Sequence, residues 1–333
     1  MSDLNSIVRD HYSALSSVEA VTNGLASVGY ISTEEISTAI YLAVHLRKPV
    51  LIEGPAGVGK TDLAQSLSKF LEVPVERLQC YEGLDESKSL YEWKYGKQLL
   101  YTQILKDRLN DVVGHAGSVA DLTARLSTFE DLFFSHDFLE PRPLLRAMEQ
   151  DAGSVLLIDE IDKSDEEFEA FLLEILSDYQ VTVPEIGTIK ANVPPIVILT
   201  SNNVRDLGDA LKRRCLHLFI GFPDADRERE IVKARVPEVS DALLKQLVAF
   251  VQELREMDLR KRPSISETVD WARTLLLLHA DSLDEALVRK TLNVLLKYES
   301  DIEATSTKIG SAARKAASAS DETRQPSGYP TFK

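Results

Sequence analysis

Cysteine and histidine are scarce in this chain, which limits the metal and redox chemistry open to it. The 333 residues include two cysteines, Cys80 and Cys215, which stand far apart and form no C-x-x-C pair. The six histidines are never spaced as a zinc site requires. We therefore expect two free structural thiols and no zinc centre.

Positive charge and long apolar runs are also lacking. Lys and Arg number 38 against 53 Asp and Glu, which gives a net charge of -15. Long-range attraction to nucleic acid or to an anionic membrane is not expected, and a protein surface is the favoured partner. No run of about 18 apolar residues occurs, and the first 20 residues lack a basic segment followed by an apolar one. These absences argue against secretion and a membrane span, and we expect a cytoplasmic protein.

Glycine is concentrated at one place, the segment GPAGVGKTDLA at residues 54–64. Gly54, Gly59, Lys60 and Thr61 fit the pattern G-x-x-x-x-G-K-[ST], in which backbone N–H groups and a helix N-terminus bind phosphates. An apolar strand at 50–52 precedes the segment and an amphipathic helix follows it, which favours a phosphate loop over a simple glycine turn. The predicted ATP-binding residues are Gly54, Pro55, Ala56, Gly57, Val58, Gly59, Lys60, Thr61 and Asp62, with Lys60 at the β and γ phosphates and Thr61 on Mg²⁺.

Two more apolar runs, at 154–159 and 195–202, do not alternate with polar residues and are typical of buried parallel strands. The first ends on Asp159 and Glu160. Asp159 suits a second-shell or water-mediated Mg²⁺ ligand, and Glu160 suits a base that polarises water for attack on the γ-phosphate. Such a pair alone could equally be a solvated strand end, but after a phosphate loop it predicts ATP hydrolysis.

Polar residues after the next strand complete the predicted site. Asn202 could orient the attacking water, although an Asn here could also simply close a turn. Arg213 and Arg214 stand just before another apolar run, where a twin arginine is usually a solvated helix end. An arginine donated to the γ-phosphate of a neighbouring subunit is the alternative, and it would make activity depend on assembly.

The order of elements predicts several segments. Residues 1–29 are typical of a helical N-terminal arm, and 30–222 read as an α/β domain. The pattern beyond 223 is helical, with helices at about 226–236, 240–257, 266–281 and 283–299, and predicts an all-helical lid over 223–303. The last segment, 304–333, is rich in Ser, Ala and Thr and predicts a disordered tail.

The chain resembles an AAA+ ATPase over about residues 30–300. It has, in this order, a phosphate loop, a strand that ends in Asp-Glu, an Asn at the end of the next strand, a pair of arginines and a helical lid. The segments CYEGLDESKSLYEW, LLIDEIDKSDEEFEAFLLEILSDYQVTVPEIG and RPSISETVDWARTL are similar to the MoxR family and, within it, to CoxD-like members. The resemblance implies an AAA+ P-loop core with a parallel five-stranded sheet ordered 5-1-4-3-2 and a helical lid. It also implies an insert at about 82–100 and a hairpin before the sensor strand, at about 179–191.

The resemblance further implies a ring, usually a hexamer, with ATP and Mg²⁺ between subunits. Family members are chaperone-like ATPases that mature or activate metalloenzymes and other complexes, commonly with a partner that carries a von Willebrand factor A domain. Many AAA+ lids also present an arginine, called sensor 2, where this chain has Ser266 and Glu267. Arg273 and Arg262 are the alternatives for this position, and the role stays unassigned.

Aromatic residues gather in the segment LYEWKYGKQLLY, which holds Tyr91, Trp93, Tyr95 and Tyr101. Aromatics at this density usually pack within their own domain, and the alternative is a surface that grips a client.

The function predicted from these features is a ring-forming ATPase that remodels a protein client. Two alternatives are weighed against it. A P-loop kinase for a small molecule would need an acceptor pocket and lid arginines that the sequence does not identify. A nucleic-acid-remodelling AAA+ ATPase would share the core, but the charge of -15 and the lack of a basic stripe weigh against it.

Overall fold

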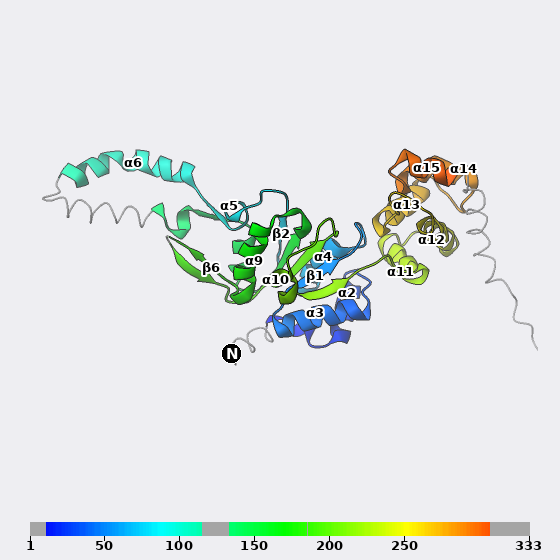
Figure 1. Cartoon of the computed structure of the whole chain (residues 1–333), viewed down its shortest axis with the longest axis horizontal. Coiled ribbons are helices and arrows are strands. Elements are labelled where there is room, and N and C mark those ends of the chain that lie inside the picture. The colour runs from blue at the N-terminus through cyan, green and yellow to red at the C-terminus, as the bar shows by residue number, and fades with distance from the viewer. Residues whose placement is uncertain (1–10, 115–132, 185, 307–333) are drawn as a thin grey trace, which may run out of the picture. The chain divides into compact units, whose positions relative to one another are not determined.

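The computed structural model describes residues 11–114, 133–184 and 186–306 (Figure 1). The described residues divide into two compact units. The sheet unit comprises residues of Met1–Val21, Glu34–Glu53 and Leu67–Leu218, and the helical unit comprises residues of Thr22–Thr33, Gly54–Ser66 and Phe219–Lys333. Each unit is described here by itself.

A five-stranded parallel sheet forms the centre of the sheet unit. Its strands are β1 (Val50–Glu53), β2 (Val75–Gln79), β5 (Val155–Asp159), β8 (Ile196–Ser201) and β9 (Leu216–Phe219). They lie in the order β9-β1-β8-β5-β2, which reads 5-1-4-3-2 when these five strands are counted among themselves. The predicted α/β core with a five-stranded sheet in this order is confirmed.

Burial along the strands explains their sequences. Every residue of β5 and of β8 is buried, because both strands lie inside the sheet and helices cover both faces. In contrast, β2 is an edge strand on which only Leu78 is buried. The register pairs Gln79 with Asp159 and Glu53 with Ser201, so the polar ends of β2, β5, β8 and β1 meet at one edge of the sheet.

A long excursion separates β2 from β5. It contains α5 (Glu86–Ser89), β3 (Tyr91–Trp93), α6 (Tyr95–Gly114), a short 3-10 turn (His136–Phe138), β4 (Leu139–Pro141) and α8 (Pro143–Met148). β3 and β4 pair antiparallel, and α8 packs on β2 and β5. The insert that the resemblance implies at about 82–100 falls in the first part of this segment, which includes α5 and β3, and its bounds stay a prediction.

The aromatic residues of this excursion take different positions. Trp93 is only 8% exposed and makes edge-to-face contacts with Tyr91 and Phe134. Tyr95 and Tyr101 are exposed. Trp93 therefore belongs to the core, as the packing interpretation expects, and it is not available to grip a client.

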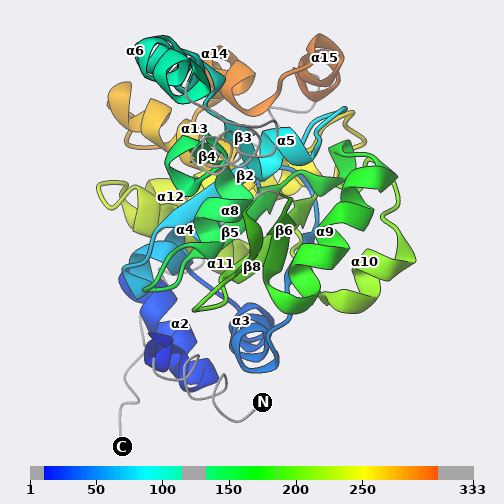
Figure 2. The same cartoon turned by 90° about the vertical axis from the view of Figure 1, so that its left-hand side faces the viewer.

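The hairpin β6 (Gln180–Val183) and β7 (Gly187–Lys190) pairs antiparallel ahead of β8. It follows α9 (Glu166–Asp178), which begins where Asp165 accepts a hydrogen bond from the backbone N–H of Phe168. α9 packs on β6 and on α10 (Asp209–Arg214) (Figure 2).

The remaining described elements are helical. A 3-10 turn (Ser13–Leu15), α2 (Val18–Ser27) and α3 (Glu34–Leu46) precede β1, and α4 (Lys60–Leu71) follows it. The helical unit continues with α11 (Ala225–Arg235), α12 (Asp241–Arg255), α13 (Ile265–Leu277), α14 (Glu285–Leu295) and α15 (Glu299–Ser306). The predicted arm at 1–29 lies partly, and the predicted tail at 304–333 almost wholly, outside the described residues. Within the described ranges, none of the helices has the length and apolar character needed to cross a bilayer.

A buried ion pair ties three helices of the helical unit together. Arg255 of α12 donates from both terminal nitrogens to the carboxylate of Glu228 of α11, at 2.7 Å each. Thr268 of α13 and Gln252 of α12 also donate to this carboxylate, and Arg255 Nε donates to the Pro263 carbonyl. Glu228 is fully buried and Arg255 nearly so, so every polar atom here depends on its partner.

We expect Arg255→Met to lower the free energy of unfolding by about 3–5 kcal/mol, because it leaves the Glu228 carboxylate buried without its counter-charge. Denaturant unfolding of the full chain measures the change. The matched control is Arg289→Met, which removes a half-exposed pair with Glu285 and should cost at most about 0.5 kcal/mol. Equal losses in the two variants would contradict the prediction.

Candidate ATP-binding and hydrolysis site

The glycine segment forms a loop between β1 and α4. Gly54, Gly57 and Gly59 all have positive φ, at 151°, 77° and 95°, a region that side chains disfavour. A Cβ on Gly57 would lie 2.2 Å from Ser264 Oγ, and one on Gly54 would lie 2.0 Å from the Ile220 carbonyl oxygen. Glycine is thus required here both by the backbone conformation and by the close approach of neighbouring atoms.

Lys60 is the first residue of α4, and it is buried. Its ammonium group donates to the carbonyls of Gly54 at 2.6 Å and of Pro55 at 2.8 Å. These contacts fold the side chain back along the loop that precedes it. Thr61 and Asp62 follow in the first turn of α4, where the partial positive charge of a helix N-terminus favours an anion.

A pocket of about 300 Å³ lies beside this loop, within the helical unit. Gly57, Val58, Gly59 and Asp62 line one part of it. Apolar walls come from Tyr30, Ile31, Ile220, Pro223, Ile231, Ile265 and Val269, and charged groups come from Arg227, Arg235 and Arg273 and from the carboxylates of Asp62 and Asp270, which pair with Arg235 and Arg273. Glycine N–H groups, three guanidinium groups and apolar walls are the chemistry that a nucleoside triphosphate requires.

The pocket contains two residues that the sequence analysis singled out. Asp62, predicted to bind the nucleotide, forms an ion pair with Arg235 of α11. Of the two lid arginines left open, Arg273 lines the pocket. Tyr30 also lines it, and burial raises the pKa of its hydroxyl.

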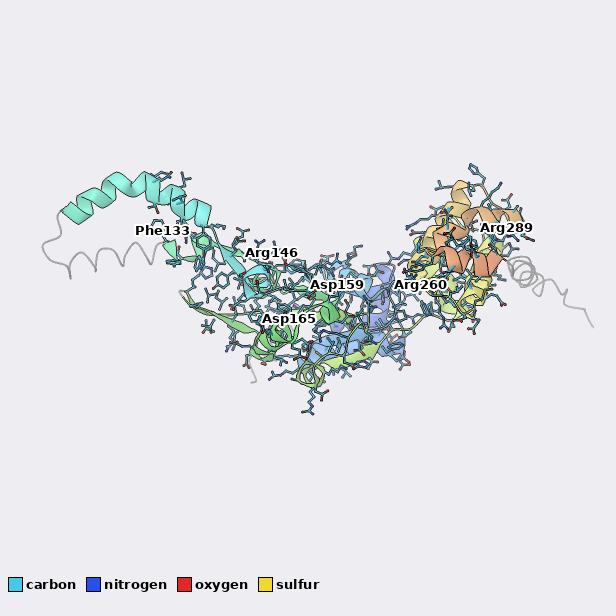
Figure 3. The ribbon with its side chains drawn as sticks, turned by 45° about the horizontal axis from the view of Figure 1, so that its top comes forward. Phe133, Arg146, Asp159, Asp165, Arg260 and Arg289 are labelled. Atoms are coloured by element: carbon cyan, nitrogen blue, oxygen red, sulfur yellow. The ribbon has the colours of Figure 1, made fainter. Side chains whose placement is uncertain are left out.

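In the sheet unit, Asp159 ends β5 and is almost fully buried (labelled in Figure 3). Oδ1 accepts a hydrogen bond from Thr200 Oγ1 at 2.5 Å. Oδ2 accepts two from Arg77, at 2.6 Å from Nη2 and 3.1 Å from Nε. The neighbouring strands β8 and β2 therefore fix both oxygens of this carboxylate.

Glu160 follows in the left-handed conformation, with φ at 58°. This conformation costs a residue with a side chain about 1 kcal/mol or more, and such positions concentrate at functional sites. The backbone N–H of Glu160 donates to Thr200 Oγ1 at 2.9 Å, which stabilises the turn. The carboxylate then leaves the strand direction and accepts hydrogen bonds from Gln79 at 2.8 Å and Lys163 at 2.6 Å.

Asn202, just after β8, reaches the same carboxylate. Its Nδ2 donates to Glu160 Oε1 at 3.2 Å, and its backbone N–H donates to Asp162 Oδ2 at 3.1 Å. The structure thus brings Asp159, Glu160 and Asn202 together, and we call these three residues the acid cluster.

Arg213 and Arg214 lie elsewhere in the sheet unit, in the last turn of α10. Both are exposed, and Arg214 donates to Ser177 Oγ of α9. Among the described residues, neither arginine pairs with a member of the acid cluster. This position therefore does not favour a role for either arginine at the hydrolysis site of its own subunit.

Sequence reasoning missed the partners of the acid cluster: Arg77, Gln79, Lys163 and Thr200. Arg77 and Gln79 are two positions apart in β2 and so share one face of that strand, a spacing that can be read from the sequence. The direction in which that face points depends on the register between β2 and β5.

The two thiols are free and buried, as predicted. The backbone N–H of Cys80 donates to the carbonyl of Asp159 at 2.8 Å, so this residue supports the acid cluster through its backbone. Burial raises the pKa of both the Cys80 and the Cys215 thiol to about 12. Neither thiol is a nucleophile at neutral pH.

Comparison with known proteins gives relatives without assigned functions. The chain is 28% identical over 238 residues to an uncharacterized protein of Staphylococcus aureus (strain bovine RF122 / ET3-1), covering 69% of this chain and 76% of the relative. It is 27% identical over 255 residues to an uncharacterized protein of Staphylococcus haemolyticus, covering 74% and 83%.

Among solved structures, the chain is similar to the RuvB Holliday junction branch migration motor of Thermotoga maritima. The identity is 18%, the TM-score is 0.42, and the match covers 79% of this chain and 67% of that chain.

A protein-family model matches residues 49–215, half of the chain, and this range contains the glycine loop, the acid cluster and both arginines of α10. The model is that of the AAA domain, dynein-related subfamily. The chain belongs to this AAA domain family.

Proposed function

We propose that this chain is an ATPase of the MoxR type that works as a ring and uses ATP hydrolysis to remodel or mature a protein client. AAA domains in general hydrolyse ATP, and the acid cluster is the observation that carries the proposal for this chain. A buried aspartate, a glutamate in a left-handed turn and an asparagine converge at the polar edge of the sheet. This arrangement suits attack of water on a phosphate.

The glycine loop and its pocket provide the groups for binding ATP. Lys60 and the N–H groups of the loop would bind the β and γ phosphates, and the apolar walls of the pocket would hold the base and sugar. Arg273 would contribute positive charge from α13. Thr61 and Asp159 would hold Mg²⁺, which neutralises phosphate charge during transfer.

The acid cluster would handle the attacking water. Glu160 accepts a proton from it, and Asn202, which already bonds to Glu160, orients it. A water placed between these two side chains is held at two points before attack. Two groups devoted to water favour hydrolysis over transfer to a metabolite, which supports an ATPase rather than a kinase.

The exposed end of α10 supports the ring. Arg213 and Arg214 carry positive charge into solvent, where they are available to the nucleotide of a neighbouring subunit. We propose that one of them completes that site in a homo-oligomer, which would be a hexamer as in related rings. ATP turnover would then require assembly.

The client is proposed to be a protein. A net charge of -15 disfavours nucleic acid, and the segments similar to CoxD-like members favour metalloenzyme maturation with a partner that carries a von Willebrand factor A domain. The cytoplasm is the expected location of this work.

Affinity capture with the Glu160→Gln variant in the presence of ATP tests this function. The variant should bind ATP without turning it over, so the assembled ring should retain its client and adaptor proteins. Lys60→Ala is the matched control, since it should bind no ATP and retain neither. Recovery of nuclease-sensitive nucleic acid in place of protein, or equal recovery by both variants, would contradict the proposal.

A further inference from the structure

Asp162 lies two residues after the proposed base, Glu160, in the 3-10 turn Ile161–Lys163. It is only 3% exposed, and its Oδ2 accepts two hydrogen bonds from the loop that follows β8. The backbone N–H of Asn202 donates at 3.1 Å and that of Val204 at 2.9 Å. One buried carboxylate oxygen therefore joins the turn after β5 to the loop after β8. All of these residues belong to the sheet unit.

This connection lies beyond the point where the main-chain pairing of the two strands ends. The parallel register of β5 and β8 runs as far as Ile158 and Leu199. After that point, Thr200 Oγ1 accepts a hydrogen bond from the backbone N–H of Glu160 at 2.9 Å, and Asp162 provides a further contact between the two segments. Side chains thus replace the strand ladder in holding together the segments on which the acid cluster lies.

The loop after β8 has a backbone conformation that requires support. Asn203 lies between the two residues that donate to Asp162, and its φ of 58° is in the left-handed region. A residue with a side chain adopts this conformation only where its surroundings hold it there. Asp162 therefore fixes the loop from which Asn202 Nδ2 donates to Glu160 Oε1 at 3.2 Å.

The two oxygens of Asp162 differ in their surroundings. Oδ1 is buried and has no hydrogen-bond partner among the described residues. Only Oδ2 contacts the loop, so these hydrogen bonds require one acceptor oxygen and not a complete carboxylate. An asparagine side chain has nearly the same shape and offers one such oxygen, with its NH₂ group in the place of Oδ1. Replacement by asparagine therefore separates the effect of the hydrogen bonds from that of the charge.

We propose that Asp162 is a positioning residue that sets the distance and direction between Glu160 and Asn202, and hence the place of the attacking water. It acts through the backbone of the loop after β8 and does not touch the reacting atoms. The inference rests on the proposed ATPase function and deepens it at the acid cluster. Misplacement of a reacting group by about 1 Å can slow a reaction about 10²-fold, so the loss of this anchor has a measurable effect.

Steady-state ATP turnover by the full-length protein tests this role. Asp162→Ala removes the acceptor and should lower kcat about 10²-fold, while KM for ATP should change less than about threefold because the glycine loop is unaltered. Asp162→Asn keeps the acceptor and loses the charge, so its kcat should stay within about fivefold of the wild type. If Asp162→Ala does not fold, Asp162→Ser replaces it, since a serine hydroxyl is one bond too short to reach both N–H groups.

A double variant shows whether Asp162 acts through Asn202. If it does, adding Asp162→Ala to Asn202→Ala should slow turnover by less than about threefold beyond the slower single variant. A residue that only stabilises the fold would add its full effect in either background. Multiplication of the two single effects would therefore overturn the positioning role.

Glu169→Ala is the matched control. Glu169 is also a buried carboxylate, 4% exposed, and it accepts a hydrogen bond from the backbone N–H of Gly208 at 2.9 Å, further along the same loop. This variant should lower the thermal stability as Asp162→Ala does but keep the wild-type kcat, and circular dichroism checks that both variants fold. An equal loss of kcat in the two variants would overturn the proposal.

Hydrogen–deuterium exchange separates this inference from the function on which it rests, because the measurement needs no nucleotide. The backbone amides of Asn202 and Val204 should be protected in the wild type and in Asp162→Asn, and should lose this protection in Asp162→Ala. Unchanged protection or an unchanged kcat in Asp162→Ala would overturn the positioning role and leave the ATPase proposal standing. A wild-type protein that hydrolyses no ATP would overturn the proposed function and with it the catalytic role of Asp162, even where exchange confirms the contact.

Discussion

Replacing Arg213 and Arg214 together by alanine is expected to reduce ATP turnover by about 10³-fold or more, the scale known for loss of an arginine finger. Both side chains are exposed at the end of α10, and the contact of Arg214 with Ser177 is the kind of surface bond whose loss changes stability by about 0.5 kcal/mol at most. Folding and ATP binding should therefore survive. Steady-state turnover and equilibrium binding of an ATP analogue measure the two effects separately.

Rings assembled from two different variants test this prediction most directly. Subunits that lack both arginines but keep Glu160 are mixed with Glu160→Gln subunits that keep both arginines. Each preparation alone should be inactive, whereas mixed rings should regain activity wherever an intact arginine faces an intact Glu160. Single replacements of Arg213 and of Arg214 then show which of the two acts. Full turnover by the double variant, or by a monomer, would contradict the assembly of the site from two subunits.

Glu160→Gln is expected to slow hydrolysis by about 10²- to 10⁴-fold, the range that a positioned general base contributes. Glutamine has nearly the same shape and the same conformational cost in the left-handed turn, but its amide cannot accept the proton of the attacking water. The glycine loop is unchanged, so binding of ATP should persist. Single-turnover measurements with prebound ATP isolate the chemical step from binding.

A charge-matched control accompanies this variant. Glu167→Gln removes an equal charge from the exposed first turn of α9, only seven positions along the chain. Its turnover should equal that of the wild type. If Glu160→Gln also hydrolysed ATP at the wild-type rate, Glu160 could not be the base, and the mechanism would have to be reassigned.

Local sequence patterns were sufficient to predict central strands of the sheet, whereas the order of its strands was predicted from the resemblance. The continuous apolar runs at 154–159 and 195–202 predict strands buried on both faces, and β5 and β8 are buried throughout. The three glycines of the predicted phosphate loop all have positive φ, a conformation that glycine adopts readily. These features depend on residues close together in the sequence. The spacing of apolar residues and the residue types at the turns are therefore enough to predict them.

The partners of the acid cluster depend on contacts that no local pattern specifies. Arg77 and Asp159 are 82 positions apart, and their contact exists because β2 pairs with β5 in one particular register. A shift of one residue would turn Arg77 and Gln79 to the other face of the sheet. The pairing of β3 with β4 likewise joins residues that are far apart in the sequence, so no local pattern specifies it. The roles of Lys60, Glu160 and the arginines of α10 remain predictions that the variants above test, and the role of Asn202 also remains a prediction.

The burial of both native cysteines allows a fluorescent label to be attached at one chosen position of this protein. Because each thiol is shielded and protonated at neutral pH, maleimide dyes should leave them unmodified. One cysteine introduced at Leu277, which is 79% exposed at the end of α13, would then be the single reactive position for a fluorophore. Fluorescence from the otherwise unaltered chain could report on the helical unit during each catalytic cycle.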